Sequence, residues 1–215
     1  MRAQSTKARA IKEAQALFQS SGYDGFSLQN LADLVGVRKA SLYEHFRSKE
    51  DLFLHLLDFL IEDFEAFART LDLFEPKDQI QALFEADVRL SQDHRLCSLS
   101  AVAIDAAKLP EVCQNKIKAF CALHHAWMSR VFAEGQERGQ FRRDMTSEAL
   151  ADMIMSLSMG VQLKARALGD VGEIRRLKEQ LSNLIGADRS HPAGPAAGKR
   201  DQGTATGPNR GPRSP

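Results

Sequence analysis

The chain has 215 residues, of which 43% are hydrophobic and 27% are charged, so it is long enough to bury a sizeable core and has the composition of a folded protein. Three cysteines without CxxC spacing exclude a secreted disulfide framework, and no apolar run approaches the roughly 18 residues of a membrane span, so we expect a cytoplasmic protein without a membrane segment. The formal net charge is only +1, but residues 1–50 hold eight Lys or Arg against five Asp or Glu.

Apolar residues recur every three or four positions, which predicts an all-α fold of about nine helices and no strand. The first helix is expected over 6–20 and the second over 28–35, with Ser27 as its N-cap. A third, over 38–45, follows directly after Gly36. Because the gap between the second and third helices is too short for an ordinary loop, this pair predicts a helix-turn-helix.

Six further helices are expected, over 49–71, 76–91, 97–107, 110–139, 147–168 and 171–185. After Gly186, glycine, proline, alanine and scattered arginine replace the apolar periodicity, which predicts a disordered tail. We therefore divide the chain into a helix-turn-helix domain at 1–47, a larger helical domain at 48–186 and a tail at 187–215.

The helix-turn-helix segment has the residue types that its geometry demands. Ala32 is small where two helices touch, Gly36 suits a turn with positive φ, and Val37 and Leu42 are apolar enough to anchor the third helix. If the third helix enters the major groove of double-stranded DNA, its polar side can reach bases and phosphates, and the basic excess of residues 1–50 suits this role.

Residues 10–53 resemble the tetracycline-repressor (TetR) family, and the run GVRKASLYEHFRSKEDLF at 36–53 is the most specific part. The resemblance implies a regulator that binds a pseudo-palindromic DNA operator as a homodimer. It implies DNA contacts from Ser27, Gln29, Arg38, Lys39, Ala40, Ser41, Tyr43, His45 and Lys49. Ala40 and Gln29 stand where the family often has glycine and arginine, so the operator sequence does not carry over.

The resemblance also implies a dimer interface on the last two helices and a ligand pocket among the fifth to eighth. For the interface we predict the apolar stripe residues Leu150, Ile154, Leu157, Val161, Leu177 and Leu181; alternatively, these stripes pack inward. For a small apolar or aromatic effector we predict contacts from Cys97, Phe120, Trp127, Met128, Met155 and Met159. Ordinary core packing is the alternative for these residues as well.

Two other signals remain open as alternatives. The segment HRLCSLSAVAID at 94–105 resembles a subgroup of the family in which a cysteine begins the sixth helix, and a thiol at a helix N-terminus is expected to have a lowered pKa, so Cys97 could sense oxidants or electrophiles. Cys121, His124 and His125 have the types and spacing of metal ligands, but three ligands on one helix rarely converge on one ion, so we predict no metal site and keep a metal-responsive regulator only as a remote alternative.

No phosphate-binding glycine loop, GxSxG or HExxH motif occurs, so we predict neither an enzyme nor a cofactor. The expected function is that of a repressor released from its operator when the larger domain binds its effector. The helix over 49–71 is expected to transmit the signal, because it begins beside the DNA and ends in the larger domain.

Overall fold

The computed structural model describes residues 5–187, and their regular structure is helical throughout apart from one isolated antiparallel bridge between Phe141 and Gly186. This confirms the predicted all-α fold. The predicted tail lies outside the described residues, except for Ala187. Within 5–187, no helix is both long enough and apolar enough to cross a membrane.

The described helices follow the predicted order, and their bounds are α1 (Thr6–Ser21), α2 (Leu28–Val35), α3 (Lys39–Tyr43), α4 (Lys49–Leu71), α5 (Pro76–Gln92), α6 (Ser98–Asp105), the 3₁₀ turn η1 (Ala106–Lys108), α7 (Glu111–Glu137), α8 (Ser147–Leu168) and α9 (Gly172–Ile185). The prediction for α3 was too long. The amide of His45 donates to the carbonyl of Leu42 in a tight turn, and Ser48 then caps α4.

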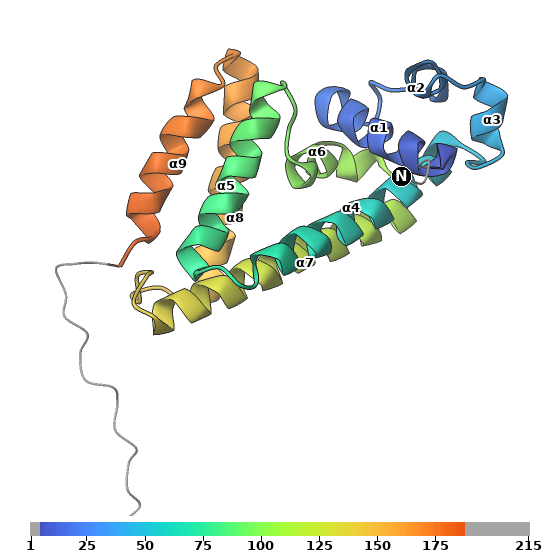
Figure 1. Cartoon of the computed structure of the whole chain (residues 1–215). Coiled ribbons are helices and arrows are strands. Elements are labelled where there is room, and N and C mark those ends of the chain that lie inside the picture. The colour runs from blue at the N-terminus through green and yellow to red at the C-terminus, as the bar shows by residue number, and fades with distance from the viewer. Residues whose placement is uncertain (1–4, 188–215) are drawn as a thin grey trace, which may run out of the picture.

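The first three helices gather at one end of the molecule (Figure 1). Gly36 ends α2 in the left-handed conformation, with φ of 71°, which a side chain would strain. Leu42 and Phe46 are fully buried and hold α3 against its neighbours, and the guanidinium of Arg9 donates to the carbonyl of Val35 at 2.8 Å. These contacts hold α3 in place, so its polar face has a fixed position on the surface.

Helix α4 packs against both the helix-turn-helix and the larger helical unit. Its Phe53 packs against Phe18 of α1, with ring centroids 5.0 Å apart, and further along α4 runs beside α7 (Figure 1). One cluster of buried apolar residues therefore extends through both predicted domains. The boundary at residues 47 and 48 stays a prediction.

Helices α7, α8 and α9 pack in succession, and α5 contacts both α7 and α9. Leu150 and Ile154 of α8 are fully buried in this core, and Leu181 of α9 is almost so. These three of the six residues predicted for the dimer interface therefore face their own protomer. Leu157 remains 37% exposed and Val161 and Leu177 are half-buried, so only these three are available to a partner.

Candidate DNA-binding surface and effector cavity

The residues predicted to contact DNA lie on the outer side of α2, α3 and the start of α4. Seven of the nine are exposed, and they are Ser27, Gln29, Arg38, Lys39, Ala40, Tyr43 and His45. Ser41 and Lys49 are half-buried. The arrangement leaves the polar side of α3 free, because its apolar side is covered by the core.

Two of these residues are also held by local contacts. The hydroxyl of Ser27 caps α2 by accepting from the amide of Asn30 at 3.1 Å. The ammonium of Lys49 lies 4.4 Å from the ring centroid of Tyr23 and 5.0 Å from that of Phe26. These cation–π contacts fix a positive charge at the start of α4, where it can meet a phosphate.

The larger unit contains a cavity of about 720 Å³, within the usual range for a small-molecule site. Side chains from α1, α4, α5, α6, α7 and α8, and from the segment leading into α6, line it. Of the six residues predicted for the effector, five line this cavity: Cys97, Phe120, Met128, Met155 and Met159. Trp127 does not, and its ring instead packs edge-on against Phe64, 5.7 Å away.

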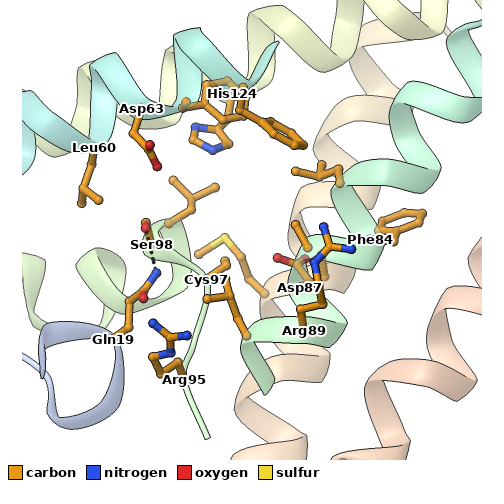
Figure 2. A pocket seen from close by; sticks show the side chains of 18 of the residues that line it. Gln19, Leu60, Asp63, Phe84, Asp87, Arg89, Arg95, Cys97, Ser98 and His124 are labelled. Carbon is orange, nitrogen blue, oxygen red and sulfur yellow. Dashed lines mark hydrogen bonds between the residues drawn. The ribbon is translucent and has the colours of Figure 1, made fainter. Parts of the chain in front are cut away.

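His124 forms part of the wall contributed by α7 (Figure 2). Its ring stacks on Phe64 at 3.5 Å, and Nδ1 donates to the carbonyl of Phe120 at 3.0 Å. Burial lowers the pKa of His124 to about 4, so the ring is neutral at physiological pH. With the proton on Nδ1, the other ring nitrogen, Nε2, is left as an acceptor.

Asp87 of α5 is a buried carboxylate in the wall of the same cavity. Its Oδ2 accepts from the hydroxyl of Ser158 at 2.8 Å and from Nε2 of Gln162 at 3.1 Å. Oε1 of Gln162 in turn accepts from the amide of Cys97 at 2.7 Å. Burial raises the pKa of Asp87 to about 6, and the hydrogen bond from Ser158 opposes this rise only in part.

The expected acidity of Cys97 is wrong. The residue does cap α6, with its sulfur accepting from the amide of Ser100 at 3.4 Å. However, burial and the nearby carboxylate of Asp87 raise the pKa of the thiol to about 11, which outweighs the helix dipole. The thiol is thus protonated at neutral pH, and we do not propose that it senses oxidants or electrophiles.

The metal alternative also receives no support. Nδ1 of His124 donates to the Phe120 carbonyl, which leaves only Nε2 of that ring as a possible ligand, and Nε2 of His125 lies 3.2 Å from the carboxylate of Asp152. Over residues 5–187 there is no group of three His, Cys, Asp or Glu side chains, Cys121 included, that could hold a metal ion.

Helix α6 links the cavity to α1. Gln19 of α1 lines the cavity, and its Nε2 donates to the hydroxyl of Ser98 at 3.0 Å (Figure 2). The carbonyl of Gln19 accepts from the amide of Leu96 at 3.1 Å. At the other end of α6, Asp105 accepts from the amide of Tyr23 at 2.9 Å. Both ends of α6 are thus bound to the helix-turn-helix unit.

Sequence reasoning missed Asp87, Gln162, Gln19 and Ser98. One signal was available for Asp87, because it falls on the same helical side as Ile80, Phe84 and Ser91, which all turn out to be buried. A carboxylate at a core-facing position is rare unless it is paired. No comparable signal marks Gln19 or Ser98, since their contact joins segments 79 positions apart.

Comparison with known proteins gives matches over both units. The family model "Bacterial regulatory proteins, tetR family" matches residues 10–56, and the model "Tetracyclin repressor-like, C-terminal domain" matches residues 76–181. The HTH-type transcriptional repressor DhaR of Mycobacterium sp. (strain GP1) is 24% identical over 181 residues, which cover 81% of this chain and 86% of that protein. The repressor ComR of Escherichia coli (strain K12) is 25% identical over 167 residues, covering 73% and 78% of the two chains.

Solved structures show the same architecture. A TetR-family regulator from Agrobacterium tumefaciens matches with a TM-score of 0.78 and 26% identity, over 85% of this chain and 98% of that one. A TetR regulator from Legionella pneumophila matches with a TM-score of 0.76 and 28% identity, over 86% and 100%. The two family models cover the helix-turn-helix and most of the larger helical unit, and the chain therefore belongs to the TetR family of DNA-binding transcriptional regulators, which are not enzymes.

Proposed function

We propose that the protein is a repressor that binds a pseudo-palindromic operator as a homodimer and leaves it when a small molecule occupies the cavity. The observation that carries this proposal is the contact between Gln19 and Ser98, because Gln19 belongs to the helix-turn-helix unit and lines the cavity at the same time. A protein that binds an operator must be in the same compartment as the DNA, so we propose that this protein acts in the cytoplasm.

A continuous set of hydrogen bonds supports the release step. It runs from Asp87 through Gln162 to the amide of Cys97, and the next residue, Ser98, accepts from Gln19. A ligand that displaces the start of α6 would therefore displace α1. Since α1 and α4 pack together, the orientation of α3 relative to a partner protomer would change with them.

The DNA contacts can be tested with an operator selected from random double-stranded DNA. We expect two half-sites whose centres lie about 10 base pairs apart or a multiple of this. Lys39→Ala should weaken binding to the selected operator by about 10- to 100-fold and make it less salt-dependent, because the exposed ammonium on α3 can reach the DNA. Fluorescence anisotropy at several salt concentrations measures both effects.

The control for this experiment is Lys118→Ala, which removes an equally exposed lysine from α7 in the larger unit. Its operator affinity should match that of the wild type. Equal losses in the two variants would mean that the charge of the whole protein, and not α3, determines the affinity.

The proposed dimer surface is a shallow groove between α8 and α9. Its apolar part is formed by Leu157, Gly160 and Val161 of α8 and Leu177 of α9, and its charged part by Glu173 with its ion-pair partners Lys164 and Arg176. Within residues 5–187, no heavy atom other than those of its chain neighbours and the nearby backbone of α8 lies within 4 Å of the position that a Cβ at Gly160 would take, so a helix of a second protomer could approach closely there. A twofold pairing of such surfaces would form a four-helix interface.

Leu157→Asp should raise the dissociation constant of the dimer by about 100-fold or more, because it would replace an apolar contact with a carboxylate that loses its hydration in the interface. Sedimentation velocity over a dilution series measures this change. Leu73→Asp is the control, since Leu73 is 98% exposed in the turn between α4 and α5. A Leu157→Asp protein that remains dimeric at the same concentrations as Leu73→Asp would exclude this surface.

A further inference from the structure

We propose that the effector is an aromatic cation, a flat ring system carrying a protonated amine, and that its ammonium group pairs with the carboxylate of Asp87. This inference rests on the proposed function only in taking the cavity as the ligand site. It replaces the small apolar or aromatic effector expected from the sequence with a more specific chemical class.

The position of Asp87 is the first reason. Only 8% of its surface is exposed, and both of its hydrogen-bond donors, Ser158 and Gln162, are neutral and bind the same oxygen, Oδ2. Within residues 5–187, Oδ1 has no hydrogen-bond partner, and no cation forms an ion pair with this carboxylate. A buried carboxylate without a positive partner is costly, and a ligand cation would remove that cost.

The protonation state suits such a pairing. The pKa of Asp87 is raised by burial to about 6, which leaves the group ionised at pH 7.5. His124 is neutral because burial lowers its pKa to about 4, and its Nε2 offers a second acceptor in the same cavity. A ligand with N–H donors therefore finds two acceptors and no histidine charge that would repel it.

The remaining wall suits an aromatic cation as well. Four aromatic side chains line the cavity, namely Phe64, Phe67, Phe84 and Phe120. Their rings can pack against a ligand ring system, and their faces attract a positive charge. The charged lining residues are three carboxylates, Asp63, Asp87 and Asp93, against the guanidinium groups of Arg89 and Arg95. Arg95 already pairs with Asp93. Figure 2 shows Asp63 and His124 on one side of the cavity lining and Asp87 and Arg89 on another.

Other ligand classes fit less well. An anionic effector would place a like charge against Asp87 in a site of low dielectric constant. A neutral effector with a hydroxyl group could donate to Oδ1 but would leave the charge of the carboxylate uncompensated, and one without a donor would leave Oδ1 an unpaired buried acceptor. Charge and hydrogen bonding together therefore select a cation.

Three probes that share one ring system test this selection, namely 1-pyrenemethylamine, 1-pyrenemethanol and 1-pyrenecarboxylic acid, which are cationic, neutral and anionic at pH 7.5. Binding is measured from pyrene fluorescence with the full-length protein. We expect the amine to bind at least about tenfold more tightly than either of the other probes, because only the amine can form a charge-assisted hydrogen bond with Asp87. Failure of all three to bind, or equal binding of all three, would overturn the proposal.

Asp87→Asn keeps the size of the side chain and an acceptor for Ser158 but removes the charge, so it should abolish the preference for the amine. Asp63→Asn is the matched control, because Asp63 lines the same cavity but is exposed, and it should retain the preference. Thermal unfolding of both variants establishes that they are folded. A folded Asp87→Asn protein that still prefers the amine tenfold would overturn the proposal.

A separate operator-binding assay distinguishes this inference from the proposed function. If the amine binds through Asp87 but the operator remains bound, the ligand class stands and the release mechanism fails. If the operator is released by probes regardless of their charge, the release mechanism stands and the ligand class fails.

Discussion

Asp87→Asn should stabilise the protein by about 3 kcal/mol at pH 7.5 and by almost nothing at pH 4. The reason is the rise in the pKa of Asp87 from an ordinary value of 3.8 to about 6 on folding, at about 1.4 kcal/mol per pH unit. Because the folded pKa is the higher one, the protonated carboxyl contributes stability below pH 4. That contribution is lost as the pH rises through 6.

His124 has the opposite effect over nearly the same range. Its pKa falls from an ordinary 6.5 to about 4, so the neutral ring contributes stability above pH 6.5 that is lost as the pH falls through 4. Between pH 4 and pH 6 the contributions of Asp87 and His124 oppose each other. The pH dependence of wild-type stability from these two groups should therefore be shallow, and Asp87→Asn should expose the His124 contribution as a steep loss below pH 6.

Urea unfolding followed by circular dichroism at pH 4, 5, 6 and 7.5 measures both effects. His124→Gln provides the converse comparison, since its stability should fall as the pH rises from 4 to 6. If Asp87→Asn and the wild type unfold at the same urea concentration at every pH, Asp87 is not a desolvated carboxylate. Asp87 would then gain nothing from a cationic partner that water does not already supply.

The double variant Gln19→Leu, Ser98→Ala should bind the operator normally but lose the coupling between ligand and operator, even at ligand concentrations that saturate its altered cavity. Replacing both partners of the bond by apolar groups leaves neither one unsatisfied, so folding should be nearly unaffected. In the wild type, coupling between two sites typically changes affinity by about 5- to 150-fold. In the double variant, we expect a saturating ligand to change operator affinity by less than about threefold.

Fluorescence anisotropy of labelled operator, with and without the pyrene probe that binds, measures this coupling. Thr70→Ala is the control, because Thr70 lines the cavity but its hydroxyl donates only to the carbonyl of Phe67 in its own helix. If ligand releases the operator equally from the double variant and from Thr70→Ala, the signal reaches the DNA by another route, such as α4 alone.

The helix-turn-helix could be predicted because local rules determine it. Ser27 and Ser48 cap helices, Gly36 takes the positive φ that ends α2, and Leu42 anchors α3, and each of these features is visible within a few residues of sequence. The end of α3 was less predictable. The turn that closes it depends on one hydrogen bond. The amide of His45 donates to the carbonyl three residues before it, and not to the carbonyl four residues before it.

The direction in which an apolar stripe faces could not be predicted. Periodicity identified α8 and α9 as amphipathic, but it does not say which neighbour covers the apolar side. Leu150 and Ile154 pack into their own protomer, whereas Leu157, three residues beyond Ile154, stays partly exposed. Only the positions of α5 and α7 settle this difference, and these are set by contacts between distant segments.

The cavity was only partly predictable for the same reason. Aromatic and methionine positions on α7 and α8 pointed to it, but the network of Asp87, Gln162 and Cys97 joins residues from α5, α8 and the start of α6. The acidity of Cys97 was misjudged because the helix dipole can be read from sequence, whereas the depth of burial and the carboxylate beside it cannot.

The most direct test of the account measures cavity occupancy and operator release in the same samples. Wild-type protein on its selected operator is titrated with the pyrene probe that binds, pyrene fluorescence reports occupancy, and anisotropy of the labelled operator reports release. We predict that release rises in step with occupancy. A cavity that fills completely while operator affinity stays unchanged would contradict the claim that the cavity controls DNA binding.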